Sequence, residues 1–134
     1  MIEIEPHIAD IRIRLKADSL ENLFSEGMKS LYDVLQPRQK KGKSSVVLSF
    51  NLTGSDITVL LIDFLNEVLS YSLINKCVYD KISIFNFSGD SLRIELQGYT
   101  GTTFLKDIKA VTFHEAEVLE SGDGIFETMV ILDI

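Results

Sequence analysis

Carboxylates near the two ends of the chain are the residues best suited to chemistry. Asp10 stands near the start, in "HIAD", and Asp133 stands in the final "MVILDI", next to Ile134 and its terminal carboxyl group. Oxygen ligands of this kind suit a hard divalent cation such as Ca²⁺, Mg²⁺ or Mn²⁺. If the first and last strands lie side by side, these three groups could hold such an ion together. The alternative is a pair of exposed acids at strand ends.

The stretch "DIKAVTFHEAEV" is the second candidate for chemistry. Strand alternation places Ala110, Thr112 and His114 on one face, which is small-sided enough for another element to pack closely against it. Lys109 points to the other face, so a regular strand keeps it apart from His114, whereas a bulge between them would bring them together. The simpler interpretations are a partly buried structural histidine and a strand-end lysine.

Other familiar chemistries find no support in the sequence. There is no G-x-S-x-G motif, and Cys77 has no near partner for nucleophilic catalysis. Neither phosphate-binding glycine loop is present, and two histidines with one cysteine at scattered positions make a poor zinc set. A hydrolase built on the same carboxylates would lack a visible substrate-binding context.

Composition restricts the class of protein and its partners. The chain has 134 residues, which fits one domain spanning 1–134, and its hydrophobic content of 46% is ordinary for a globular protein. A net charge of −7 disfavours direct nucleic-acid binding and suits a basic partner or a cation. The basic run Arg38, Lys40, Lys41 and Lys43 is interpreted as a solvated loop, or as a contact for an acidic partner or RNA.

The sequence predicts a cytoplasmic protein. Its one cysteine, Cys77, rules out an intrachain disulfide, which fits a reducing compartment. The acidic start "MIEIEPHIAD" does not resemble a signal peptide. No apolar stretch approaches the roughly 20 residues needed to span a bilayer, so no membrane contact is expected.

Hydrophobic periodicity predicts the elements that must position these groups. Strands are predicted at residues 9–17, 46–52, 81–87, 91–99, 108–118 and 125–134, and helices at 18–35 and 53–73. The first helix has Asp18 and Glu21 in a capping-box pattern, and Ser55 or Asp56 is the expected N-cap of the second. Off the apolar stripe of the second helix lie Asp63, Asn66 and Glu67, on a face that is solvated or presented to a partner.

Short turns between the last four predicted strands indicate two hairpins. The order β, α, β, α followed by four strands indicates an α+β fold, with two helices packed on a largely antiparallel β-sheet. Alternation groups Asp133 with Met129 and Ile131, but groups Asp10 with Arg12. Regular strands would therefore leave one acid on a core-facing side and the other on a polar side, so the two are expected to meet only at a rim.

Four segments together resemble the archease family. They are "HIADIRIRLKADSLENLF", "LLIDFLNEVL", "IKAVTFHEAEV" and "VILDI", in the family order and spacing over nearly the whole chain. The resemblance implies a small α+β protein, not itself an enzyme, that assists an RtcB-type RNA ligase in tRNA splicing and RNA repair. That ligase uses GTP and Mn²⁺ and passes through a guanylylated histidine of its own. Archeases promote this guanylylation and multiple turnover.

The resemblance also implies roles for particular residues. Asp10 and Asp133, beside Ile134, match the acids of a metal-binding end that is held to be essential for activation. Lys109 matches the lysine of the strand motif. His7 and His114 match motif histidines. The cofactor implied is a divalent metal ion, Ca²⁺, Mg²⁺ or Mn²⁺, and the partner implied is the ligase.

The chain departs from the family pattern at two places. Ile8 and Arg12 stand where the family start usually has threonine and glycine, and the cation of Arg12 on the strand face of Asp10 would weaken a metal site. Before the lysine motif, "GYTGTTFLKD" replaces a Gly-Glu turn and a further Asp and His. Gly98 is expected to keep the turn, while Tyr99 replaces the glutamate.

A second function of a different class also fits the resemblance. Archeases have been described as chaperone-like modulators of RNA-modifying enzymes such as tRNA methyltransferases. That function would need an apolar or charged docking face and no metal, so binding of a divalent cation separates the two.

Overall fold

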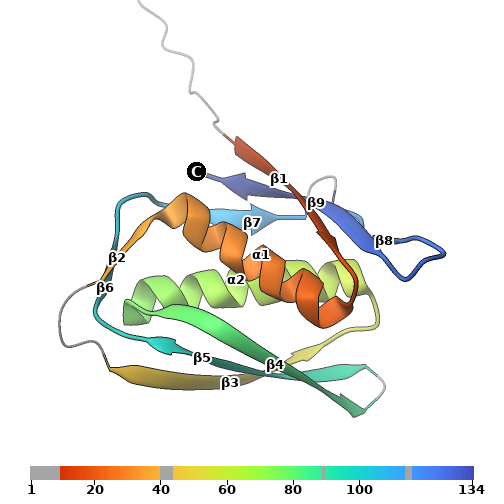
Figure 1. Ribbon diagram of the computed structural model, residues 1–134, viewed down its shortest axis with the longest axis horizontal. Coiled ribbons are helices and arrows are strands. Elements are labelled where there is room, and N and C mark those ends of the chain that lie inside the picture. The colour runs from red at the N-terminus through yellow and green to blue at the C-terminus, as the bar shows by residue number, and fades with distance from the viewer. Residues whose placement is uncertain (1–9, 40–43, 89, 114–115) are drawn as a thin grey trace, which may run out of the picture.

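The computed structural model describes residues 10–39, 44–88, 90–113 and 116–134 (Figure 1). In chain order it contains β1 (Asp10–Ala17), α1 (Leu20–Leu35), β2 (Pro37–Gln39), β3 (Ser45–Thr53), α2 (Ile57–Asn75), β4 (Val78–Ser88), β5 (Ser91–Tyr99), β6 (Thr102–Phe104), β7 (Ala110–Thr112), β8 (Leu119–Glu120) and β9 (Phe126–Asp133). The predicted α+β class is confirmed, with two helices and antiparallel strand pairs within the described residues.

Two sheets enclose the helices (Figure 1). β9 lies between β1 and β7 in one sheet, with β8 paired to its first residues, and β5 lies between β3 and β4 in the other. α1 contacts β1 and β4, and α2 contacts β7 and β3, so each helix touches both sheets. The core therefore lies between the inner faces of the sheets, where Phe64, Ile94 and Leu132 are fully buried.

α1 is capped by Ser19, whose hydroxyl accepts a hydrogen bond from the Asn22 N–H at 3.1 Å. The sequence pattern assigned this position to Asp18, which was wrong by one residue. Asp18 instead accepts a hydrogen bond from the side-chain amide of Asn22 at 2.7 Å. The helix ends at Leu35 because Gln36 adopts the left-handed conformation and donates its N–H to a carbonyl of the last turn.

α2 is the central helix, and its N-cap is Asp56, one of the two predicted residues. The Asp56 carboxylate accepts a hydrogen bond from the Thr58 N–H at 2.8 Å. By length and composition this 19-residue helix could cross a membrane, so the expectation that no apolar stretch is long enough was wrong. In the fold, α1 and strands of both sheets contact this helix, and residues such as Leu61, Phe64 and Val68 are buried against them.

A buried tyrosine joins three elements in the core. The Tyr32 hydroxyl on α1 accepts a hydrogen bond from the Tyr79 N–H on β4 at 3.0 Å and lies 2.7 Å from the Ser72 hydroxyl on α2. Burial raises the pKa of Tyr32 to about 12, although both hydrogen bonds act in the opposite direction. Burial likewise raises the pKa of Tyr79 to about 12.

The predicted strand at 108–118 is the largest departure from the sequence pattern. Only Ala110–Thr112 forms β7 on β9, and Leu119–Glu120 forms the short β8. Of the described residues between them, none pairs with β9, and the Thr58 hydroxyl on α2 accepts a hydrogen bond from the Val118 N–H at 2.9 Å. Asn66 on α2 bonds to Val111 within β7. A second, smaller departure is the pairing of β2 with β6, in segments predicted as loops.

Candidate functional site

Asp10 and Asp133 are direct cross-strand partners at the end of the β1–β9 ladder. Opposed residues in an antiparallel pair share a face, with Cβ atoms about 4.5–5.5 Å apart. The expectation that the two acids lie on opposite sides was therefore wrong. Its premise failed at β9, where Leu132 is buried on the inner face and Ile131 is only 3% exposed on the outer face. A strand that is buried on both faces is apolar on both, so alternation did not reveal which face is the core.

Lys109 lies beside the same strand end. Its N–H donates a hydrogen bond to the Asp133 carbonyl at 2.7 Å, and the next residue, Ala110, is the cross-strand partner of Asp133 on the side away from Asp10. The Lys109 side chain is exposed. The structure thus brings together three residues that the sequence singled out, with Asp133 in the middle.

Arg12 approaches the acidic end from β1. Its Nη2 atom lies 4.0 Å from Oδ2 of Asp10, and both side chains are about half exposed, at 50% and 43%. Exposed pairs at this distance contribute little, typically below about 1 kcal/mol, so the contact does not lock Asp10 in place. It does put a positive charge next to the carboxylate, as expected from the departure at this position.

A hollow of about 340 Å³ adjoins the acidic end, and we call it the C-terminal hollow. It is lined by Ile11, Val34, Gln36, Lys106, Asp107 and Ile134. The carboxyl end of α1 meets the 105–107 segment here, since the Leu35 carbonyl accepts from the Lys106 N–H at 3.1 Å. The last turn of α1 carries no basic side chain of its own, and Lys106 is a cation that lines the hollow at the negative end of the helix dipole.

The donor set fits a hard cation better than zinc. Within the described residues, no three histidine, cysteine, aspartate or glutamate side chains gather closely enough to hold a metal. The site would therefore consist of Asp10, Asp133, the terminal carboxylate of Ile134 and water. Ca²⁺ and Mg²⁺ accept such all-oxygen sets, and Mg²⁺ usually retains several waters. The opposed carboxylates are the observation that supports this fit.

The other candidates from the sequence lie outside the described residues or on another element. His7 and His114 lie outside the described residues, as do Lys40, Lys41 and Lys43 of the basic run. Arg38 belongs to β2, where it is exposed opposite Thr103.

Asn66 is a residue whose role the sequence analysis missed. Its side-chain amide donates to the Val111 carbonyl at 2.8 Å and accepts from the Val111 N–H at 2.9 Å, so it pairs with β7 as a neighbouring strand would. It also donates to the Ile62 carbonyl at 3.2 Å. Asn66 thereby fixes β7, which in turn places Lys109 against Asp133. The only signal in the sequence was a polar residue beside an apolar helical stripe.

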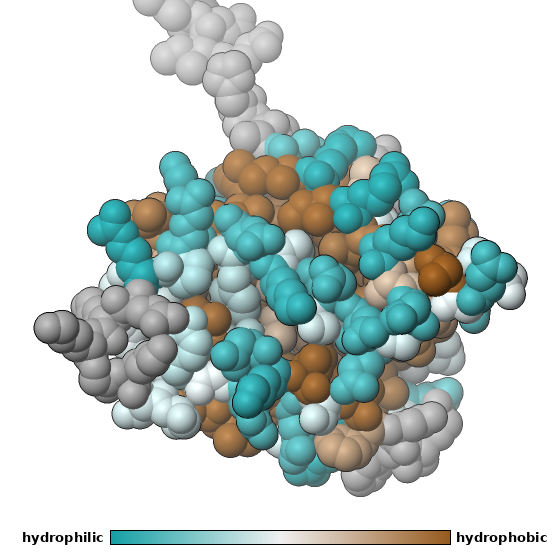
Figure 2. Space-filling model, viewed as in Figure 1, coloured by the Kyte–Doolittle hydropathy of each residue, from teal (hydrophilic) through white to brown (hydrophobic). Residues whose placement is uncertain are grey.

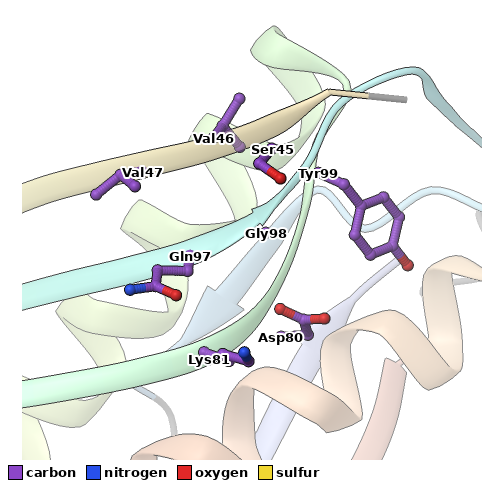
Figure 3. Close-up of a pocket in the computed structure, with 8 residues that line it drawn as sticks. All are labelled: Ser45, Val46, Val47, Asp80, Lys81, Gln97, Gly98 and Tyr99. Atoms are coloured by element: carbon purple, nitrogen blue, oxygen red, sulfur yellow. The ribbon is translucent and has the colours of Figure 1, made fainter. Parts of the chain in front are cut away.

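Gly98 does not form a turn, contrary to expectation, but lies within β5 opposite the irregular part of β4. A Cβ atom there would stand 1.9 Å from the Val78 carbonyl oxygen, so only glycine allows β4 to approach this closely. A hollow of about 300 Å³ lies at this place, between Asp80 and Lys81 on one side and Val47 on the other (Figure 3). Of the predicted site residues that the structure describes, none lines it.

The chain is similar to one protein family over nearly its whole length. Residues 3–134 match the Archease protein family. The "Protein archease" of Pyrococcus furiosus is 27% identical over 135 residues, covering 96% of this chain and 94% of that protein. The one of Methanosarcina barkeri is 25% identical over 141 residues, covering 96% and 92%.

Two solved structures share the fold. One is an archease from Thermotoga maritima, described as a possible chaperone, with a TM-score of 0.69 and 18% identity, covering 100% of this chain and 98% of that one. The other is a protein of Methanobacterium thermoautotrophicum, with a TM-score of 0.68 and 22% identity, covering 99% and 96%. The predicted α+β architecture agrees with both.

Proposed function

This chain belongs to the archease family, and we propose that it is a protein cofactor, not an enzyme, that activates an RtcB-type RNA ligase. In this proposal it promotes guanylylation of the ligase and multiple turnover in tRNA splicing and RNA repair. The observation that carries the proposal is the direct opposition of Asp10 and Asp133 next to the end of the chain. Lys109 is held at the same strand end by its hydrogen bond to Asp133.

Each of these residues has a part in the proposed mechanism. Asp10, Asp133 and the Ile134 carboxylate would hold a divalent ion. When bound, that ion supplies positive charge against the negative charge that develops during nucleotidyl transfer. Lys109 adds a cation next to the acidic end, on a backbone that is bonded to Asp133. Asn66 keeps β7, and hence Lys109, in register with β9.

Guanylylation of the ligase at limiting Mn²⁺ and GTP tests the proposal. We expect Asp10→Ala and Asp133→Ala each to lower the rate by at least about tenfold, which corresponds to roughly 1.4 kcal/mol. Glu127→Ala is the matched control, because Glu127 is a carboxylate on the same strand whose nearest cation is Arg14 at 3.4 Å. Calorimetric titration of each variant with Mn²⁺ and Ca²⁺ gives a readout that does not depend on the ligase. If both folded aspartate variants activate like the wild type, the acidic end is not the activating site.

A chaperone-like modulator of RNA-modifying enzymes is the second candidate. It is favoured by the description of the Thermotoga maritima structure as a possible chaperone. This function has no need for a cation at Asp10 and Asp133. Absence of Mn²⁺ or Ca²⁺ binding at millimolar concentration, together with unimpaired activation by the aspartate variants, would favour it over the metal-dependent activator.

A further inference from the structure

The segment Leu105–Asp107 separates two hollows at the end of the molecule that holds the acidic site. Lys106 and Asp107 line both of them, the C-terminal hollow on one side and a second hollow of about 310 Å³ on the other. Leu105 is 52% exposed at this segment. Figure 2 shows hydrophobic surface next to hydrophilic side chains at the end of the molecule where β1 begins and β9 ends. This end therefore presents apolar and charged groups side by side.

We call the second hollow the Lys76–Lys106 hollow. Its lining residues are Leu73, Lys76, Thr102, Thr103, Phe104, Lys106 and Asp107. Leu73 and Phe104 are half-buried and give it an apolar part, while the two lysines are exposed. Asp107 is its one acid. The hollow thus combines an apolar surface with two ammonium groups, a pattern that suits an acidic group carried on an apolar stem.

Thr102 gives this hollow an unused hydrogen-bonding group. The residue is 1% exposed, and its hydroxyl has no hydrogen-bond partner within the described part of the chain. Its backbone N–H is already bonded to the Lys76 carbonyl at 3.1 Å. A buried hydroxyl without a partner costs about 1–3 kcal/mol, so an incoming acceptor gains more from it than from an exposed hydroxyl.

The charge around the hollow differs in sign from that of the whole protein. Net charge is −7, yet Lys76 and Lys106 both line the hollow, and Arg38 is the cross-strand partner of Thr103, another of its lining residues. An acidic segment of a partner is repelled by most of this surface and attracted here. Charge patterns of this kind orient partners and speed their encounter.

We propose that the Lys76–Lys106 hollow and Leu105 form a docking site for an acidic segment of a partner protein. A carboxylate of that segment enters between Lys76 and Lys106 and accepts a hydrogen bond from the Thr102 hydroxyl, and an apolar side chain packs on Leu105. This inference rests on the proposed function, because it takes the ligase as the partner. Docking here places the adjoining acidic end against the ligase, since both hollows share Lys106 and Asp107.

The test measures the affinity of the chain for the purified ligase and the maximal guanylylation rate. We expect Lys76→Glu with Lys106→Glu to weaken binding by at least about tenfold, and the effect to shrink at high salt. The maximal rate at saturating concentration should stay within about twofold, because the double variant leaves Asp10 and Asp133 in place. Lys29→Glu with Lys81→Glu is the control, with the same change in charge at exposed positions away from the hollow.

Thr102→Val tests the carboxylate contact separately. Because the hydroxyl has no partner within the described residues, this variant should be at least as stable as the wild type while binding the ligase less tightly. Unchanged affinity in Thr102→Val would overturn the contact, and unchanged affinity in the lysine double variant would overturn the docking site.

The two proposals fail in different ways. If the double variant binds normally but the wild type still activates the ligase, only the docking site is wrong. If the double variant lowers the maximal rate without changing affinity, the hollow acts in activation and the docking site is again wrong. If the wild type neither binds the ligase nor accelerates guanylylation, the proposed function itself fails.

Discussion

At the scale of single residues, a surface carboxylate gains a role from its cross-strand neighbours. Asp133 has Asp10 on one side and the small Ala110 on the other. Two like charges placed opposite each other destabilise a sheet unless a cation lies between them. Arg12 is the cation that the structure places nearest to Asp10, and it therefore competes with any metal ion for that carboxylate.

Arg12→Ala should increase the affinity of the acidic end for Mn²⁺ and Ca²⁺. The guanidinium is 4.0 Å from the Asp10 carboxylate, and removing an exposed pair of this kind changes the free energy by at most about 1 kcal/mol, or roughly fivefold in affinity. Titration calorimetry measures the change. Arg14→Ala is the control, because Arg14 is paired with Glu127 at 3.4 Å, farther along the strand. Weaker metal binding in Arg12→Ala would contradict competition between the two cations.

Asn66→Ala should lower the free energy of unfolding by about 1–3 kcal/mol, because it leaves the Val111 N–H and carbonyl without their side-chain partner. Asn66→Asp should cost at least as much, since a carboxylate cannot donate to that carbonyl. Urea denaturation gives both values. Asn51→Ala, at an exposed position on β3, should change stability by less than about 0.5 kcal/mol.

The hydrogen-bonding partner of Asn66 could not be predicted from the sequence. Its polar character was visible, but the partner, Val111, lies 45 residues away. Periodicity predicts which face a residue occupies, and it carries no information about which distant backbone group meets that face. The carboxylates were found because their types and strand-end positions suggested chemistry before any contact was known.

At the scale of elements, the regular helices and half-buried strands were predictable and the irregular segments were not. The strand at Asp10–Ala17 has one polar and one apolar face, and its more exposed and more buried residues alternate in the structure as the sequence predicted. Residues 108–118 also alternate, but only Ala110–Thr112 of this stretch pairs with β9, and the backbones of Val111 and Val118 bond to side chains of α2. The pairing of β2 with β6 involves three residues on each side, and a stretch of three residues is too short for hydrophobic alternation to predict a strand.

Gly98→Ala should be strongly destabilising because of how closely β4 and β5 approach. The added Cβ would lie 1.9 Å from a backbone oxygen and 2.7 Å from the Tyr79 Cα, so one strand must move. We expect a loss of at least about 2 kcal/mol in the free energy of unfolding. Gly122→Ala is the control, because nothing lies within 4 Å of the place that a Cβ atom would take at that residue. Equal stability of the two variants would show that β4 accommodates the methyl group.

At the scale of the whole molecule, stability should fall in alkaline solution. Burial raises the pKa of Tyr32 to about 12, above the unfolded value near 10, so the unfolded chain ionises first. The contribution of Tyr32 is fully present below about pH 10 and is lost as pH rises through 12, by up to about 3 kcal/mol. Denaturation midpoints between pH 9 and 12 measure this loss.

Tyr32→Phe provides the comparison for the alkaline experiment. It should start less stable, because the Tyr79 N–H loses its acceptor, and its stability should fall less steeply above pH 10. Tyr79, whose pKa is also raised to about 12, should account for part of the remaining slope. Parallel pH curves for the two proteins would mean that Tyr32 does not ionise on unfolding.

The position of β9 has a consequence for how the protein is made. This strand follows all the other described elements in the chain, yet it is the central strand of its sheet, with β1 and β7 on its two sides. During translation β1 leaves the ribosome first and must wait, with its pairing edge unfilled, until residues 126–133 follow it. The other sheet is complete much earlier, at Tyr99. The acidic end can therefore form only after residues 126–133 have been synthesised, later than the other sheet.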